Sequence, residues 1–134
     1  MSKLTNIEGI GEAYARKLGE VSITTREGLL EKGASPRGRK EIAEKTGIAE
    51  KSILRWVNQA DLSRIKGVSE EYAELLEVAG VDTVPELAQR KSENLHQKMV
   101  EVNEARQLVR KLPSATQVSG WIEQSKGLPR VVLY

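Results

Sequence analysis

The feature that most constrains the fold of this chain is an internal repeat. The run Ile-Glu-Gly-Ile-Gly-Glu-Ala-Tyr-Ala at residues 7–15 matches Ile-Lys-Gly-Val-Ser-Glu-Glu-Tyr-Ala at residues 65–73, an offset of 58. The match continues at Leu18/Leu76, Ile23/Val81, Thr25/Thr83 and Leu29/Leu87. Because so long a run of like residues is not accidental, the sequence predicts two copies of one structural unit.

Each copy ends with a tryptophan pattern, Trp-Val-Asn-Gln-Ala at residues 56–60 and Trp-Ile-Glu-Gln-Ser at residues 121–125. The offset has grown to 65, so the second copy holds roughly seven extra residues, which we place between Val102 and Leu112. The predicted boundaries are therefore 1–62 and 63–134. A chain of 134 residues has the length of one ordinary domain, so we expect the two copies to pack into one compact body.

Helix start and stop signals predict about four short helices in each copy. In the first copy they cover residues 11–19, 25–32, 36–45 and 49–60, and in the second 69–79, 83–90, 93–102 or beyond, and 114–126. Residues 83–86 and 114–117 have the pattern of capping boxes. No strand pattern competes except in residues 130–134, which could pair or fray. The predicted fold class is all-α.

Composition excludes several classes of function. The chain has no cysteine and a single histidine, His96, so thiolate or imidazole-rich metal sites are excluded and no catalytic constellation is visible. We therefore expect no enzyme activity and no cofactor. The chain lacks a signal-like or membrane-spanning apolar stretch, which predicts a cytoplasmic protein without a membrane partner.

The charge distribution favours the first copy as the partner of a polyanion. The net charge of the whole chain is only +2. Residues 1–60 carry 11 Lys and Arg against 8 acidic residues, whereas residues 61–134 carry 10 against 11. A nucleic acid should therefore prefer the first half.

The first hairpin has the residues of a phosphate-binding turn. Glycines at 9 and 11 allow a sharp turn and leave backbone N–H groups exposed at a helix N-terminus, where an anion is favoured. We expect Ile7 and Ile10 to anchor the turn, Gly9 and Gly11 to face outward, and the residues Tyr14, Ala15 and Leu18 to be buried. Arg16 and Lys17 would then lie near the open side. This resembles the helix-hairpin-helix class of DNA repair, recombination and replication proteins, which implies binding to the sugar-phosphate backbone; the alternative is a simple helix connector.

The second hairpin departs from that pattern. Ser69 replaces the second glycine, and the following helix presents Glu70, Glu71, Glu74 and Glu77, with Lys66 as the one cation of the turn. Carboxylates repel a phosphate, so this copy is interpreted as a structural repeat with a solvated acidic face.

Residues 40–56 carry a second signal, a helix-turn-helix-like pattern with Ala43 at the helix crossing, Gly47 at the turn, Ile48 after it, and Ile53 and Trp56 as buried anchors. In that arrangement the outer face of the second helix, with Glu50, Lys51, Arg55 and Asn58, would enter a major groove. The basic run Arg37, Arg39 and Lys40 would contact phosphates. Any two helices that meet at a glycine turn need similar residues, so a purely structural origin remains the alternative.

Taken together, the hairpin run, the Thr-Gly-Ile turn, residues 53–62 and the Trp-Ile-Glu-Gln pattern resemble the prokaryotic domain-of-unknown-function family 4332 over about residues 4–128. The resemblance implies a tandem helix-hairpin-helix fold and no established activity. We predict a non-enzymatic binding module for DNA or RNA, with these contact residues: Gly9, Ile10, Gly11, Arg16, Lys17, Arg37, Arg39, Lys40, Lys51 and Arg55. The alternative is a protein-interaction or self-association module that uses the acidic helix of the second copy or the Trp56 and Trp121 surfaces.

Overall fold

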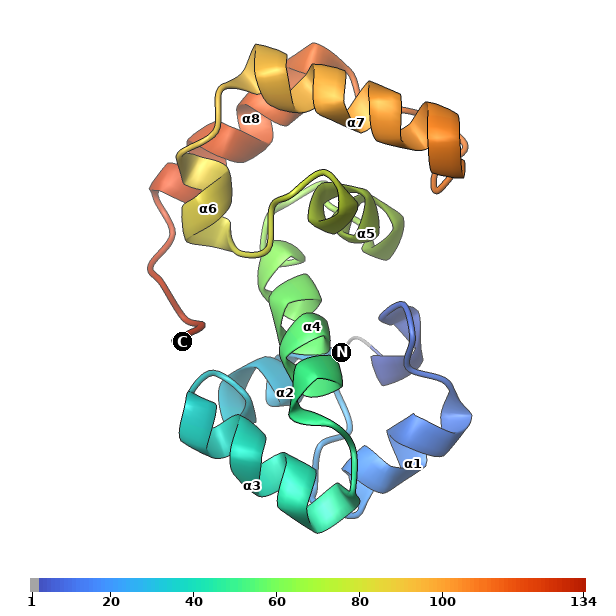
Figure 1. Cartoon of the computed structure of the whole chain (residues 1–134). Coiled ribbons are helices and arrows are strands. Elements are labelled where there is room, and N and C mark those ends of the chain that lie inside the picture. Colours follow the sequence, from blue (N-terminus) through green and yellow to red (C-terminus); the bar gives the residue numbers. More distant parts are fainter. Residues whose placement is uncertain (1–2) are drawn as a thin grey trace. The chain divides into compact units, whose positions relative to one another are not determined.

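The computed structural model describes residues 3–134, and within them the chain is all-helical, as predicted, with one isolated β-bridge between Lys3 and Thr25 (Figure 1). The chain divides into two compact units. The first unit contains the chain up to Asp61 together with Val131–Tyr134, and the second contains Leu62–Arg130. Each unit has its own buried apolar cluster.

The first unit contains a short 3-10 helix and four α-helices: η1 (Leu4–Asn6), α1 (Glu12–Gly19), α2 (Arg26–Lys32), α3 (Pro36–Thr46) and α4 (Glu50–Leu62). Thr25 and Ser35 begin α2 and α3, since each side-chain oxygen accepts a hydrogen bond from a backbone N–H three residues on. Gly47 ends α3 with a positive φ of 76°, the left-handed conformation that glycine adopts without steric cost. The core takes apolar residues from every helix of the unit, including Leu18, Leu29, Ile42 and Ile53.

The second unit contains α5 (Glu70–Val78), α6 (Val84–Ala88), α7 (Ser92–Arg106) and α8 (Ala115–Lys126). Helix α8 packs against α6 and α7, and α5 packs against α7. Helix α7 runs beyond Val102 and is followed by a loop in which the Asn103 side chain bonds the backbone N–H and C=O of Val109, at 2.9 and 3.2 Å. The extra residues predicted between 102 and 112 therefore fall at this helix end and loop.

One of the two predicted capping boxes is confirmed and the other is wrong. The Ser114 Oγ accepts from Gln117 N, and Gln117 Oε1 accepts from Ser114 N. At Thr83 the side chain makes no capping bond, and the Glu86 carboxylate accepts from the backbone N–H of Asp82, at 3.1 Å, rather than from that of Thr83. The Thr83 hydroxyl is buried without a hydrogen-bond partner within residues 3–134.

The last four residues of the chain pack on the first unit. Val132 is buried in its core, and Leu133 N donates to Ala34 O at 2.7 Å. The Tyr134 hydroxyl donates to Asn58 Oδ1 at 3.2 Å. The C-terminal segment is therefore ordered against the first unit rather than frayed.

Candidate nucleic-acid interface

The first hairpin is a tight turn between η1 and α1. Ile10 N donates to Ile7 O at 3.1 Å, and the side chains of both isoleucines are buried, as predicted. Gly9 has a φ of +93°. Gly11 precedes α1 in an extended conformation, is exposed, and has no atom within 4 Å of where a Cβ would lie. No side chain caps α1, so the backbone N–H groups of its first turn have no side-chain partner at Gly11.

The Trp56 indole packs against this turn at Gly9. A Cβ built on Gly9 would lie 3.2 Å from Trp56 Nε1, so the indole occupies the space that a side chain would need. Gly9 therefore turns its side-chain position toward the indole, while its backbone is exposed. Glycine is favoured here for two reasons: its positive φ, and the close approach of the indole, which would have to move by a few tenths of an ångström to admit a side chain.

Tyr14 differs from the prediction. It was expected to be buried with Ala15 and Leu18, but 41% of it is exposed. Its ring packs at a tilt on the Trp56 indole, with centroids 5.2 Å apart, and the Lys17 ammonium lies 5.9 Å from the ring centroid. Leu18 is fully buried and Ala15 partly so, in agreement with the prediction.

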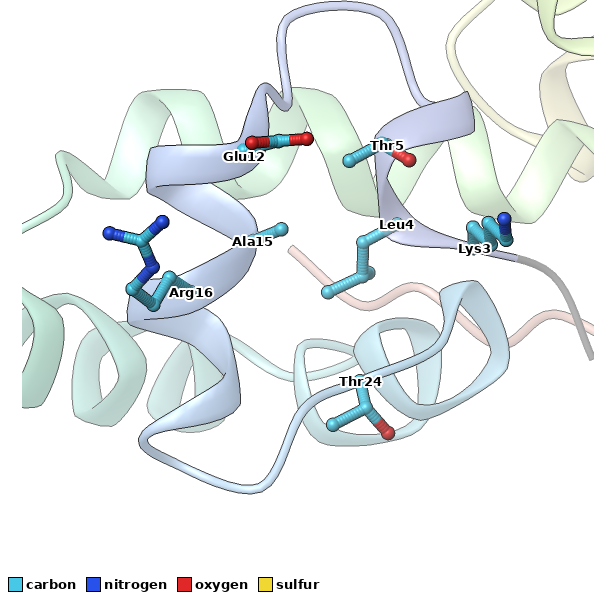
Figure 2. Close-up of a pocket in the computed structure, with 7 residues that line it drawn as sticks. All are labelled: Lys3, Leu4, Thr5, Glu12, Ala15, Arg16 and Thr24. Atoms are coloured by element: carbon cyan, nitrogen blue, oxygen red, sulfur yellow. The ribbon is translucent and has the colours of Figure 1, made fainter.

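The two cations of α1 are exposed. Arg16 lies at the edge of a groove of about 430 Å³ between η1 and α1. Figure 2 shows Leu4 and Ala15 facing each other across this groove, whereas the Arg16 guanidinium points away from Leu4. Glu12, in the first turn of α1, and Thr5 also line this groove. The cationic group of Arg16 is thus presented outward, one helical turn beyond the hairpin.

Residues 65–69 form a turn of the same local geometry. Val68 N donates to Ile65 O at 3.1 Å, Gly67 has a φ of +94°, and a Cβ on Gly67 would lie 3.1 Å from Trp121 Nε1. The chemistry at the helix start differs. Ser69 Oγ accepts a hydrogen bond from Tyr72 N at 3.3 Å and so caps α5, whereas the start of α1 has no side-chain cap. Glu70 and Glu71, in the first turn of α5, are exposed.

Gln124 is a supporting residue that the sequence reasoning missed. Its side-chain amide makes two hydrogen bonds to the backbone of Lys66. The Lys66 N–H donates to Gln124 Oε1 at 3.0 Å, and Gln124 Nε2 donates to Lys66 O at 3.1 Å. The signal was present, because the Trp-x-x-Gln pattern ends both copies. In the sequence this pattern indicated only the internal repeat, whereas in the structure the Gln124 side chain also holds the backbone of the second turn.

The three basic residues of α3 differ in exposure: Arg37 and Lys40 are exposed, and Arg39 is buried. Arg37 is exposed and forms an ion pair with Glu41 (Nε to Oε1, 3.5 Å), and Lys40 is exposed. Arg39 is only 6% exposed, and its guanidinium donates to Gly33 O, Ala34 O and Leu133 O at 2.9, 3.1 and 2.7 Å. Burial lowers the Arg39 pKa, and the nearby Tyr134 and Glu50 raise it. Contrary to expectation, the Arg39 side chain is used inside the fold and is not presented to a phosphate.

The helix-turn-helix-like segment is formed by α3, the Gly47 turn and α4. Ile48, Ile53 and Trp56 are buried as predicted, and Lys51 and Arg55 are exposed. Asn58, the fourth member of the proposed groove-reading face, is 7% exposed and accepts from the Tyr134 hydroxyl. The exposed part of that face is therefore smaller than predicted, because Asn58 is buried and bonded to Tyr134 of the C-terminal segment.

Other kinds of site have little support in the described part of the chain. Residues 3–134 contain no group of three or more His, Asp or Glu residues placed to hold a metal ion. His96 Nε2 lies 2.9 Å from Pro113 O, a contact that joins α7 to the start of α8. None of the helices in residues 3–134 has the length and apolar content needed to cross a membrane.

The structure defines an all-α chain of two small units, each with a glycine-containing turn packed on a tryptophan. In a comparison with family models, residues 8–128 match the Domain of unknown function (DUF4332), and the chain belongs to that family. No curated protein and no solved structure matches the chain.

Proposed function

We propose that the chain is a non-enzymatic, tandem helix-hairpin-helix module that binds the backbone of DNA or RNA through its first hairpin. The observation that carries the proposal is the uncapped start of α1 at the exposed Gly11, together with the exposed cations Arg16 and Lys17 in the last turn of this short helix. Backbone N–H groups at a helix start donate hydrogen bonds to a phosphate, and nearby cations strengthen the contact.

The contrast between the hairpins supports the assignment to the first one. Both turns have a positive-φ glycine over an indole, which makes them comparable scaffolds. Only the second start is capped by a serine and followed by two exposed glutamates. A phosphate at Ser69 would compete with the serine oxygen and meet negative charge.

The proposed contact set is smaller than the sequence alone suggested. It keeps Gly9, Gly11, Arg16 and Lys17, with Arg37, Lys40, Lys51 and Arg55 as exposed cations of the same unit. It omits Arg39 and treats Ile10 as a buried anchor. With so few cations, binding should be modest in affinity and independent of base sequence.

The test exchanges the residues that begin the two helices. Gly11→Ser introduces the cap seen at Ser69, and Ser69→Gly is the matched control. Titration with single- and double-stranded oligonucleotides at about 50 and 200 mM salt should show weaker binding for Gly11→Ser and unchanged binding for Ser69→Gly. Gly11→Ser should be as stable as wild type or slightly more so, which separates lost binding from lost folding. No binding by wild type at the lower salt would contradict the proposal.

A protein-interaction module is the second candidate, and one observation favours it: the exposed carboxylates Glu70 and Glu71 at the start of α5. They would suit a basic partner surface. The indoles of Trp56 and Trp121 do not contribute to this candidate, because each is 3% exposed.

A further inference from the structure

Tyr14 is an exposed aromatic side chain beside the first hairpin. Three large hydrophobic residues are exposed within residues 3–134, and the other two, Leu133 and Tyr134, belong to the C-terminal segment. Tyr14 is 41% exposed although its ring packs on the Trp56 indole, with centroids 5.2 Å apart. It follows Gly11 by three residues, which is about 4.5 Å along the axis of a helix. An aromatic ring with access to solvent therefore lies within one helical turn of the uncapped start of α1.

The second copy shows what covers the matching tyrosine there. Tyr72 packs on the Trp121 indole in the same way, with centroids 5.3 Å apart. Unlike Tyr14, it is only partly exposed, and its hydroxyl donates to Lys111 O at 2.9 Å. Lys111 lies in residues 102–112, the stretch to which the sequence assigns the extra residues of this copy. The first copy lacks that insertion, and its tyrosine stays exposed.

The residue three positions after each tyrosine also differs between the copies. In the second copy it is Leu75, which is fully buried. In the first copy it is Lys17, which is exposed and has its ammonium 5.9 Å from the centroid of the Tyr14 ring. A cation–π contact at an exposed site is weaker than the stacking of a nucleic-acid base on an aromatic ring. A base can therefore displace the ammonium from the ring, and the ammonium can then contact the adjoining phosphate.

We propose that the first hairpin selects single-stranded nucleic acid, with one base stacked on Tyr14 and the adjoining phosphate held by the start of α1 and by Lys17. The inference rests on the proposed function, from which the phosphate contact is taken. The bases of a duplex are paired and stacked on one another, whereas an unpaired strand can turn a base onto a ring beside its backbone. Because every base has a π-face, this contact selects for an unpaired strand and not for a base sequence.

The contribution of the base can be measured on the wild-type protein. Three probes of about 12 nucleotides are titrated at about 50 mM salt: oligothymidylate, an abasic strand of the same length, and the duplex of oligothymidylate with its complement. The two single strands carry the same phosphates, so a difference between their affinities reports the bases. We expect oligothymidylate to bind about tenfold more tightly than the abasic strand. Equal affinities would overturn the inference and leave the proposed function in place, whereas no binding of any probe would overturn both.

Replacing the ring tests whether Tyr14 is the residue that holds the base. Tyr14→Leu should lower the affinity for oligothymidylate about tenfold, to that of the abasic strand, and leave duplex binding unchanged. Tyr14→Phe keeps the ring and should bind all three probes as wild type does. Tyr72→Leu is the matched control, because Tyr72 has the same packing in the second copy, and it should change no affinity. Circular dichroism verifies that each variant is folded, and the comparison of the two strands on wild type does not depend on any variant. A folded Tyr14→Leu protein that still prefers oligothymidylate, or that loses duplex binding to the same extent, would overturn the inference.

Discussion

The indole of Trp56 lies against Gly9, and the indole of Trp121 lies against Gly67 in the same way. In each pair a Cβ on the glycine would approach the indole Nε1, to 3.2 and 3.1 Å, and the glycine φ is positive, at 93° and 94°. Each turn thus depends on a glycine for its backbone and on a tryptophan for its support.

We predict that Gly9→Ala and Gly67→Ala each lower the free energy of unfolding by about 1–2 kcal/mol or more. The positive φ accounts for the lower figure, and displacement of the indole adds to it. Gly120→Ala is the control, because Gly120 lies within α8 with no atom within 4 Å of an added Cβ. That change should raise stability by about 0.5–1 kcal/mol. Urea denaturation monitored by circular dichroism measures all three.

Truncation of either tryptophan should be more severe. Trp56 and Trp121 are each 3% exposed and each packs on a tyrosine, Tyr14 or Tyr72, at centroid distances of 5.2 and 5.3 Å. Trp56→Ala or Trp121→Ala should cost about 3–5 kcal/mol, as for other large buried side chains. A loss below about 1 kcal/mol in both variants would contradict their assignment to the two cores.

A matched pair of threonines should respond in opposite directions. Thr25 Oγ1 accepts from Gly28 N at 3.0 Å and caps α2, whereas the Thr83 hydroxyl is buried and has no hydrogen-bond partner among residues 3–134. Thr25→Val should cost about 1 kcal/mol through loss of the cap. Thr83→Val should be neutral or stabilising by up to about 1 kcal/mol, because it removes an unsatisfied buried hydroxyl. Equal losses in the two variants would show that Thr83 has a partner in solution.

The fold could be predicted from sequence where the signal is local. The burial of Ile7 and Ile10, the Ser114 capping box and the burial of Ile48, Ile53 and Trp56 depend on residues a few positions apart, and their patterns were sufficient. Helix periodicity placed Tyr14 on the inner face, yet Trp56 packs against its ring and leaves 41% of the residue exposed. Periodicity gives the direction of a side chain but not the extent of the surface that covers it.

The candidate site could be predicted less well, because one of its limits is set by a distant segment. Arg37, Arg39 and Lys40 look alike in sequence, and only Arg39 is buried. Its partner Leu133 lies 94 positions away, and Asn58 is covered by Tyr134 at a separation of 76. Local composition contains no information about such contacts. The Thr-x-x-Glu pattern at Thr83 failed for another reason, since the Glu86 carboxylate bonds the N–H of Asp82, one residue earlier than a capping box requires.

The stability of the protein should depend on pH through Asp82. Burial raises the pKa of this carboxyl, and the nearby Glu86 and Glu77 raise it further. A pKa raised by folding means that the stabilising contribution is present below the unfolded pKa, near 3.9, and is lost as pH rises through the folded pKa. Asp82→Asn should therefore stabilise the protein at about pH 7, by no more than about 1 kcal/mol because the carboxylate keeps part of its hydration, and have no effect near pH 3. Urea denaturation of both proteins at the two pH values measures this difference.

The proposed interface makes a prediction about charge that does not depend on helix capping. Replacing both Arg16 and Lys17 with Glu should weaken binding to all oligonucleotide sequences alike, because phosphate contacts position a protein without specifying bases. On duplex DNA each lost contact should reduce the slope of log affinity against log salt by about 0.9, so the double change should reduce it by about 1.8 if both residues contact phosphates. Lys66→Glu is the matched control, since Lys66 is the exposed cation of the second hairpin and Glu70 and Glu71 follow it. Titrations over a series of salt concentrations, with circular dichroism to verify folding, measure the slopes. Equal slopes for wild type and the Arg16/Lys17 variant would exclude these two residues from the interface even if the protein binds nucleic acid.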